Sequence, residues 1–206
     1  MSGVGDSMIS EFVDSLINDG VLSRVGGESY RSNMPPHRLI RYFVGRGIYV
    51  DLESISGYLP WDEFEALIRL VFEEWGGFNV VSRLRVPVVG TRVEFDVIAY
   101  RRPRVFLIEA KRWKRASSSI RRIVGRHLEK VGGFVAREPE VLMSRVGIGW
   151  GGEALLIPVV ITWHRALMEL IDGVPVVSIY QVNSFINELD GIIDSIRLFR
   201  VSWRHV

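Results

Sequence analysis

The sequence predicts an α/β domain with a mixed central sheet over residues 61–206, preceded by a helical extension over residues 1–60. Three observations support this prediction. Segments with helical spacing of apolar residues alternate with short strand-like segments after Trp61. Residues 154–163 are almost wholly apolar, as a central strand buried on both faces should be. The chain has 206 residues and a 48% hydrophobic content, which is enough for one domain with a core and an extension.

The extension is expected to consist of helices and loops. Residues 7–19 predict an amphipathic helix that ends at Gly20, and residues 35–47 predict a second helix with Pro at its start. Residues 23–36 are rich in Ser, Gly and Pro, which favours a loop. A small winged-helix-like module is an alternative, but no segment stands out as a recognition helix.

In the larger domain, apolar spacing and turn residues set the expected elements. The first helix has Phe64, Leu67, Ile68 and Val71 on one face, and a pair of glycines ends it. In chain order, the expected elements are helix 61–78, strands 79–89, 91–100 and 104–113, helix 117–134, strands 154–163 and 173–182, and helix 183–196.

The charge of the chain is unevenly distributed. The formal net charge is +2, yet residues 101–137 contain twelve Arg or Lys residues and only two Glu, a net +10. A solvated surface is the ordinary explanation of a short charged run. A block this concentrated favours a polyanionic partner, such as nucleic acid.

The composition also excludes several classes of protein. There is no Cys, which fits a reducing compartment and excludes Cys-ligated zinc and iron–sulfur clusters. No apolar run reaches membrane-spanning length, and the first residues lack a signal-peptide pattern. We therefore expect a cytoplasmic protein that does not bind membranes.

Charged residues interrupt two of the predicted strands. Glu94 and Asp96 flank Phe95, and Glu109 and Lys111 are two residues apart in the next strand. Because residues two apart share a face of a strand, pairing would bring carboxylates and an ammonium group together. The carboxylates would repel each other unless a divalent cation such as Mg²⁺ lay between them. A lysine beside such an ion suits phosphodiester hydrolysis, because it can orient water and offset developing charge.

The arrangement Asp96, twelve residues, then Glu109-Ala110-Lys111 resembles the D-x(n)-(D/E)-x-K signature of the PD-(D/E)XK, or restriction-endonuclease-like, nuclease superfamily. The resemblance covers roughly residues 61–185. It looks most like type IV restriction endonucleases and archaeal Holliday-junction resolvases. It implies an α-β-β-β-α-β core with a mixed central sheet, and a metal-dependent endonuclease that hydrolyses DNA to leave 5′-phosphates.

The resemblance also implies roles for individual residues. Asp96 and Glu109 would be ligands of Mg²⁺ or Mn²⁺, and the backbone carbonyl of Ala110 would be a further ligand. Lys111 would be the catalytic base or charge stabiliser, and Glu65 the carboxylate supplied by the first helix.

The sequence departs from the family pattern in two places. The Val86-Pro87 segment lacks the acidic residue that the family name implies, so Asp96 must supply it. The Gln-x-x-x-Tyr motif of the exonuclease branch is absent, because Phe185 follows Gln181 at that spacing.

Several residues have alternative interpretations. Asp62 and Glu65 have capping-box spacing, and Glu63 and Glu73 are the other helix carboxylates that could join the site. Glu94 is expected to be exposed or outside the first shell of ligands, and His127 to be structural. The predicted nucleic-acid contacts are Arg112, Lys114, Arg115, Arg121 and Arg122, for which a solvated face is the alternative.

Two further functions remain open at this stage. One is a nucleic-acid-binding protein on the same fold that has lost catalysis, and the other is an assembly subunit with an acidic protein partner. The predicted partner is nucleic acid, most of all DNA, and a homodimer is compatible with the sequence. Basic residues report phosphate, and therefore leave open DNA or RNA and a duplex, single-stranded or branched substrate.

Overall fold

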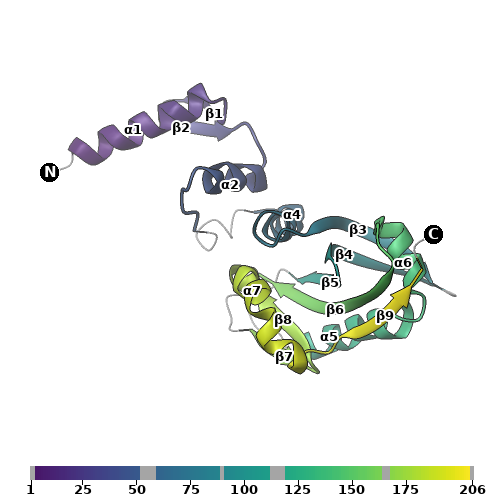
Figure 1. Ribbon diagram of the computed structural model, residues 1–206. Coiled ribbons are helices and arrows are strands. Elements are labelled where there is room, and N and C mark those ends of the chain that lie inside the picture. Colours follow the sequence, from purple (N-terminus) through teal and green to yellow (C-terminus); the bar gives the residue numbers. More distant parts are fainter. Residues whose placement is uncertain (1–2, 52–58, 89–90, 112–118, 164–167, 205–206) are drawn as a thin grey trace. The chain divides into compact units, whose positions relative to one another are not determined.

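The computed structural model describes residues 3–51, 59–88, 91–111, 119–163 and 168–204 (Figure 1). The chain divides into two compact units, Met1–Asp51 and Leu52–Val206, where the sequence predicted a boundary after residue 60.

Unit 1, Met1–Asp51, contains two helices and a β-hairpin. Its elements are α1 (Gly3–Asn18), β1 (Leu22–Gly26), β2 (Ser29–Ser32) and α2 (Pro36–Gly45). The predicted loop over residues 23–36 was therefore wrong, because most of it forms the antiparallel pair β1–β2. Gly26 and Gly27 have positive φ values of 147° and 53°, which lets the chain reverse within two residues. The Ser and Gly residues of this segment leave no apolar alternation, so the sequence did not predict strands there.

Unit 2, Leu52–Val206, is an α/β structure. Its first half consists of α4 (Trp61–Leu70), the π-helical η1 (Val71–Trp75), β3 (Asn79–Val88), β4 (Thr91–Arg101), β5 (Arg104–Lys111), α5 (Ile120–Leu128) and the π-helical η2 (Glu129–Val135). Its second half consists of α6 (Pro139–Val146), β6 (Gly152–Thr162), β7 (Glu169–Ile171), β8 (Val174–Ser178), η3 (Ile179–Gln181), α7 (Val182–Ile192), η4 (Ile193–Ser195) and β9 (Phe199–Trp203).

The strands of unit 2 form one mixed sheet in the order β3-β4-β5-β6-β8-β7, with β9 also pairing with β6. The pairs β5–β6 and β6–β8 are parallel, and the other pairs are antiparallel. Strand β6 pairs with β9 over Gly152–Leu156 and with β8 over Val160–Thr162, so it serves as the central strand. The predicted α/β class with a mixed central sheet is confirmed.

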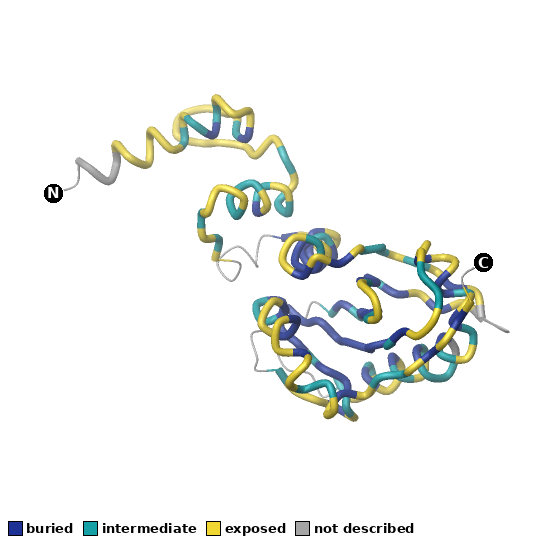
Figure 2. The backbone as a smooth tube through the Cα atoms, in the orientation of Figure 1, coloured by how far each residue is buried: buried dark blue, intermediate teal, exposed yellow. Residues whose placement is uncertain are grey.

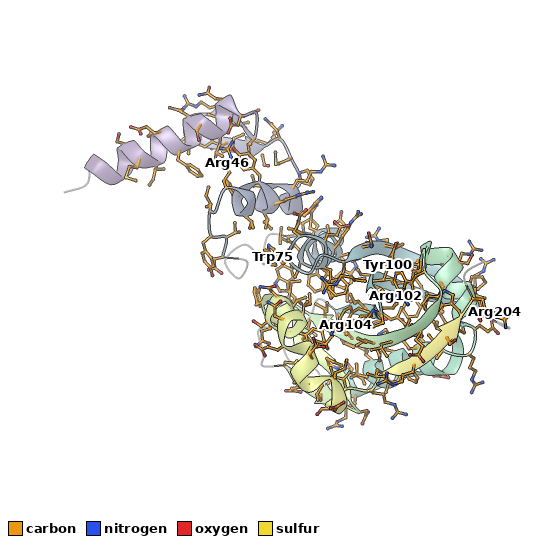
Figure 3. The ribbon with its side chains drawn as sticks, in the orientation of Figure 1. Arg46, Trp75, Tyr100, Arg102, Arg104 and Arg204 are labelled. Atoms are coloured by element: carbon orange, nitrogen blue, oxygen red, sulfur yellow. The ribbon has the colours of Figure 1, made fainter. Side chains whose placement is uncertain are left out.

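Helices cover both faces of this sheet. On one face, Phe72 of η1 and Phe185 of α7 have ring centroids 5.3 Å and 6.1 Å from Phe106 of β5. On the other face, η2 and α6 pack over Leu107 and its neighbours. Strands β5, β6 and β8 are largely buried (Figure 2), and side chains fill the space between the layers (Figure 3). Each fully buried large apolar side chain contributes about 1.5–3 kcal/mol to folding.

Three elements of unit 2 were not predicted. Helix α6 is only eight residues long; it begins at Pro139 and ends at Val146, before Gly147, which has a φ of 76°. Strand β7 is three residues long, and strand β9 is five residues long and has exposed residues at alternate positions. All three are too short for a clear period in the sequence. Within the parts of the chain that the structure describes, no helix is long and apolar enough to cross a membrane.

Candidate active site

The candidate site lies where strands β3 and β4 lose their regular alternation. A regular strand places residues three apart on opposite faces. Here two pairs of residues that are three apart face the same core cluster: Val81 and Leu84 of β3, and Phe95 and Ile98 of β4. The alternation therefore shifts between them, at the level of Arg83 and Asp96. Arg83 has a φ of 52°, which is unusual for a residue with a side chain.

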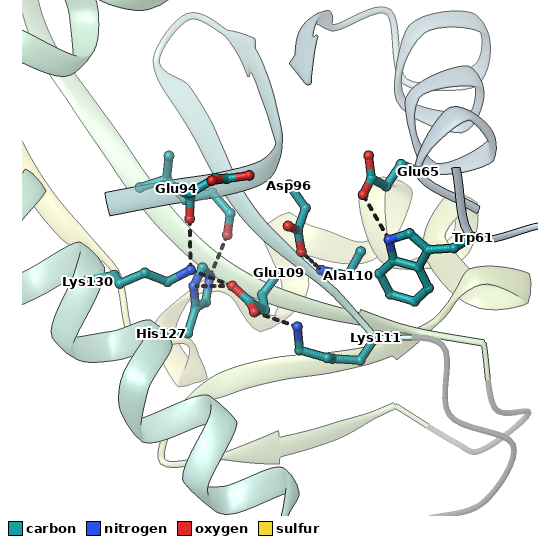
Figure 4. Close-up of polar contacts among 10 residues, drawn as sticks. Trp61, Glu65, Glu94, Asp96, Glu109, Ala110, Lys111, His127 and Lys130 are labelled. Atoms are coloured by element: carbon teal, nitrogen blue, oxygen red, sulfur yellow. Dashed lines mark hydrogen bonds and ion pairs between the residues drawn. The ribbon is translucent and has the colours of Figure 1, made fainter. Parts of the chain in front are cut away.

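Asp96 lies just beyond the regular pairing of β4 with β5. The last residues paired at this end are Val97 and Ile108, so one further step places Asp96 opposite Glu109. Instead of a strand pair, the backbone N–H of the buried Ala110 donates a 2.7 Å hydrogen bond to Oδ2 of Asp96 (Figure 4). Burial raises the pKa of Asp96 and the nearby Glu109 carboxylate raises it further, while the hydrogen bond from Ala110 opposes them.

Glu109 is held between two lysines. Lys111 Nζ lies 2.7 Å from Oε1, and Lys130 Nζ contacts Oε2 (Figure 4). The side chain of Glu109 is only 15% exposed. Burial alone would raise its pKa, but the hydrogen bonds from Lys111 and Lys130 outweigh this, and the pKa is lowered. Glu109 is therefore ionised at neutral pH and carries a partner on each oxygen.

His127 of α5 is fully buried beside Glu109. Its Nε2 lies 2.7 Å from the carbonyl oxygen of Leu107, which can only accept, so Nε2 carries the proton. Burial and the nearby Lys130 lower the pKa of His127 to about 4, and the ring is neutral at pH 7. Its Nδ1 has no hydrogen-bond partner among the described residues and lies 3.9 Å from Oε2 of Glu109. The histidine thus anchors α5 to β5, as the structural interpretation predicted.

Glu65 of α4 is a buried carboxylate with two fixed donors. Trp61 Nε1 donates to its Oε1 at 3.2 Å, and Arg83 Nε donates to its Oε2 at 2.6 Å. The Glu65 charge helps to raise the pKa of Asp96, behind burial and the charge of Glu109, so it acts on the site electrostatically. The capping-box alternative was wrong, because α4 begins at Trp61 with Pro60 as its N-cap and no side-chain cap.

A cleft of about 510 Å³ opens between β5 and α5. It is lined by Glu109, Lys111, Ile123, Arg126, His127, Glu129 and Lys130. Three of these side chains are basic and two are acidic, and the ammonium groups of Lys111 and Lys130 contact the half-buried carboxylate of Glu109. The basic side chains favour a negatively charged ligand at the opening of the cleft.

The other predicted residues have different positions. Glu94 is exposed and pairs with Arg85 at 2.7 Å, which fits its expected place outside the ligand set. Glu73 pairs with Arg69 on the exposed side of its helix. Arg121 and Arg122 are exposed at the start of α5. Arg112, Lys114 and Arg115, which were also predicted to contact nucleic acid, lie outside the described residues.

Sequence reasoning missed Lys130 and Arg83 as members of the site. Lys130 follows Leu128 on the predicted helix, and its neighbour Glu129 made it resemble a surface residue. The π-helical turn that begins at Glu129 is not detectable from apolar spacing. Arg83 lies in a strand that carries another arginine two residues later, so its pairing with Glu65 had no distinct signal.

The residues present fit a hard divalent cation. Asp96 and Glu109 offer carboxylate oxygens, and Mg²⁺ is commonly held by one or two carboxylates with water and substrate oxygens. No cluster of three or more His, Cys, Asp or Glu side chains suited to a metal occurs in the described ranges. A site here would thus depend on two carboxylates and on oxygen atoms that are not side-chain groups, such as the Ala110 carbonyl.

Comparison with known proteins gives no family assignment. No protein-family model matches the chain, and no curated protein matches it. Two solved structures are similar in part. The first is a protein of unknown function, AF1548, with 16% identity over 49% of this chain and 45% of that one, and a TM-score of 0.32. The second is VC1899 from Vibrio cholerae, with 10% identity over 91% of this chain and 43% of that one, and a TM-score of 0.39.

Proposed function

We propose that this chain is a metal-dependent nuclease of the PD-(D/E)XK superfamily that hydrolyses phosphodiester bonds in DNA. The proposal rests on one observation: Asp96, Glu109 and Lys111 lie close together where the pairing of β4 with β5 ends. Asp96 contacts the backbone of Ala110, and Lys111 pairs with Glu109 at 2.7 Å. Burial and the charge of Glu109 raise the pKa of Asp96, and a carboxylate kept in such surroundings favours a functional origin.

The chemistry follows from the residue types. Asp96 and Glu109 would hold Mg²⁺ or Mn²⁺, with the Ala110 carbonyl as a further ligand. When bound, the ion would supply positive charge at the phosphate and make a nearby water more acidic. Lys111 would hold a water molecule or a phosphate oxygen beside Glu109, because its side chain is 27% exposed and lines the cleft. Glu65 would act on Asp96 through its charge, and Arg83, which pairs with Glu65, would offset that charge.

The basic surface supports a nucleic-acid substrate. Arg121, Arg122 and Arg126 are exposed along α5, and Arg126 also lines the cleft. Contacts of such side chains with phosphates position a nucleic acid without reading its sequence. We therefore propose that the enzyme cuts a phosphodiester bond, and we assign it no preference for the base sequence around that bond.

A substrate panel tests the proposal. Labelled duplex, single-stranded, nicked and four-way-junction DNA, with an RNA duplex for comparison, are incubated with the protein in Mg²⁺, Mn²⁺ or EDTA. We expect cation-dependent cleavage of at least one DNA and products with 5′-phosphates. Binding without cleavage on every substrate would support the inactive nucleic-acid-binding alternative, and the absence of both would refute the proposal.

A further inference from the structure

Lys130, the second residue of η2, is positioned by three contacts. Its Nζ donates to the backbone carbonyl of Glu94 at 3.0 Å and contacts Oε2 of Glu109. It also lies 5.2 Å from the centroid of the Phe95 ring. The side chain is 23% exposed. The ammonium group is thus held in place at the inner side of the cleft.

Its position matters because both oxygens of Glu109 already have a cationic partner. Lys111 is on Oε1 and Lys130 is on Oε2. A divalent cation on Glu109 would lie close to these ammonium groups, and like charges at such distances repel strongly in a partly buried site. Binding of the cation must therefore weaken at least one of the two lysine contacts.

Lys130 is the lysine that can leave Glu109 at the lower cost. When it moves, the Glu94 carbonyl and the Phe95 ring still bind it. Nδ1 of the buried His127, which has no hydrogen-bond partner among the described residues, also lies 3.9 Å from the same carboxylate oxygen and can accept a hydrogen bond. An ammonium group released from Glu109 thus still has two acceptors nearby, the Glu94 carbonyl and Nδ1 of His127.

We propose that Lys130 is an internal counter-ion of Glu109 that competes with the divalent cation for this carboxylate. In the cation-free protein it holds the half-buried carboxylate of Glu109 in a fixed orientation. On cation binding its ammonium group leaves Glu109 and stays on the Glu94 carbonyl and the Phe95 ring, where its charge still faces the cleft. This inference rests on the proposed function, because it takes Glu109 to be a cation ligand.

The test measures Mn²⁺ affinity directly by isothermal titration calorimetry, without DNA. The variants are Lys130→Met and Lys130→Gln, which remove the competing charge. The matched control is Arg126→Met, which removes one positive charge from the same cleft, while Arg126 has no contact with Glu109 among the described interactions. Glu109→Gln defines the signal without the site, and circular dichroism verifies that each variant is folded.

We expect both Lys130 variants to bind Mn²⁺ about tenfold more tightly than wild type, a change of about 1.4 kcal/mol. Arg126→Met should change the affinity by much less. Mn²⁺ should also raise the melting temperature of the Lys130 variants more than that of wild type. Unchanged or weaker binding in both Lys130 variants, with normal binding in wild type, would overturn only this inference. No binding by any of the folded proteins would overturn the metal site and the inference together.

Discussion

The backbone N–H of Ala110 donates a 2.7 Å hydrogen bond to the carboxylate of Asp96, at the point where the pairing of β4 with β5 stops. The side chain takes the place of a strand partner and satisfies a buried amide. Asp96 is therefore part of the fold as well as part of the candidate site. Substitutions there must be chosen so that these two roles are separated.

The first prediction separates them with two variants. Asp96→Asn keeps an oxygen for the Ala110 amide and removes the charge, so cleavage should be lost while the melting temperature stays at or above that of wild type. Asp96→Ala leaves the amide without its acceptor and should cost about 1–3 kcal/mol of stability. Urea denaturation and a cleavage assay distinguish the two effects. Equal stability of both variants would contradict the role of the hydrogen bond.

The second prediction concerns Lys111. Replacement by Met removes an ammonium group that pairs with Glu109 and lines the cleft. Turnover should fall by about 10²-fold or more, the range for a group that assists proton transfer. DNA affinity, measured separately, should change little. If DNA affinity falls while turnover stays intact, Lys111 is a phosphate anchor.

The third prediction concerns salt dependence. Arg121→Ala with Arg122→Ala should weaken DNA binding for all sequences and flatten the plot of log affinity against log salt, by about 0.9 per lost duplex phosphate contact. The matched control replaces Arg145 of α6 and Arg200 of β9, which are also exposed. If the slope changes equally in both double variants, α5 is not the main DNA-binding surface.

The fourth prediction concerns pH and His127. Its pKa is lowered from 6.5 to about 4 by burial, so between these values the unfolded chain binds a proton that the folded protein does not. The free energy of unfolding contributed by this group is therefore present above pH 6.5 and is lost as the pH falls toward 4, by about 3 kcal/mol in total.

Urea denaturation at pH 7 and pH 4.5 measures this loss. His127→Gln keeps a donor for the Leu107 carbonyl and should reduce the difference between the two pH values. His37→Gln, in unit 1, controls for removal of a histidine from the chain. An unchanged pH dependence in His127→Gln would refute the assignment of the stability loss at low pH to His127.

The fifth prediction concerns the backbone at Arg83. At a φ of 52° a glycine is unstrained, whereas alanine carries the penalty of a left-handed conformation. Both substitutions lose the ion pair with Glu65. Arg83→Gly should therefore unfold at a higher urea concentration than Arg83→Ala. The reverse order would show that the backbone at this position is not left-handed.

Much of unit 2 could be predicted from the sequence because its strands are apolar and flanked by turns. The largely apolar strand β6 is the clearest case, and Glu109 and Lys111 were placed on one strand face by simple alternation. The break in alternation at Arg83 and Asp96 could not be predicted, because it depends on two strands shifting together. The same holds for Lys130, which reaches the site through the π-helical segment η2 and contacts with β4 and β5.

The extension shows a second kind of limit. The hairpin β1–β2 is mostly exposed and contains Ser, Arg and Gly, so neither propensity nor alternation indicated strands there. Two glycines with positive φ determine it instead. Where a hairpin has no buried face, its turn residues indicate it, whereas elsewhere in the chain the apolar alternation indicates the strands.

The central claim is tested most directly by one cleavage measurement on matched proteins. Wild type, Asp96→Asn, Glu109→Gln and Lys111→Met are purified in parallel and incubated with the most sensitive DNA of the panel in Mg²⁺, Mn²⁺ or EDTA. The account predicts cation-dependent cleavage by wild type and a loss of at least 10²-fold in each folded variant. Cleavage that persists at the wild-type rate in all three variants would show that the activity does not arise from this site.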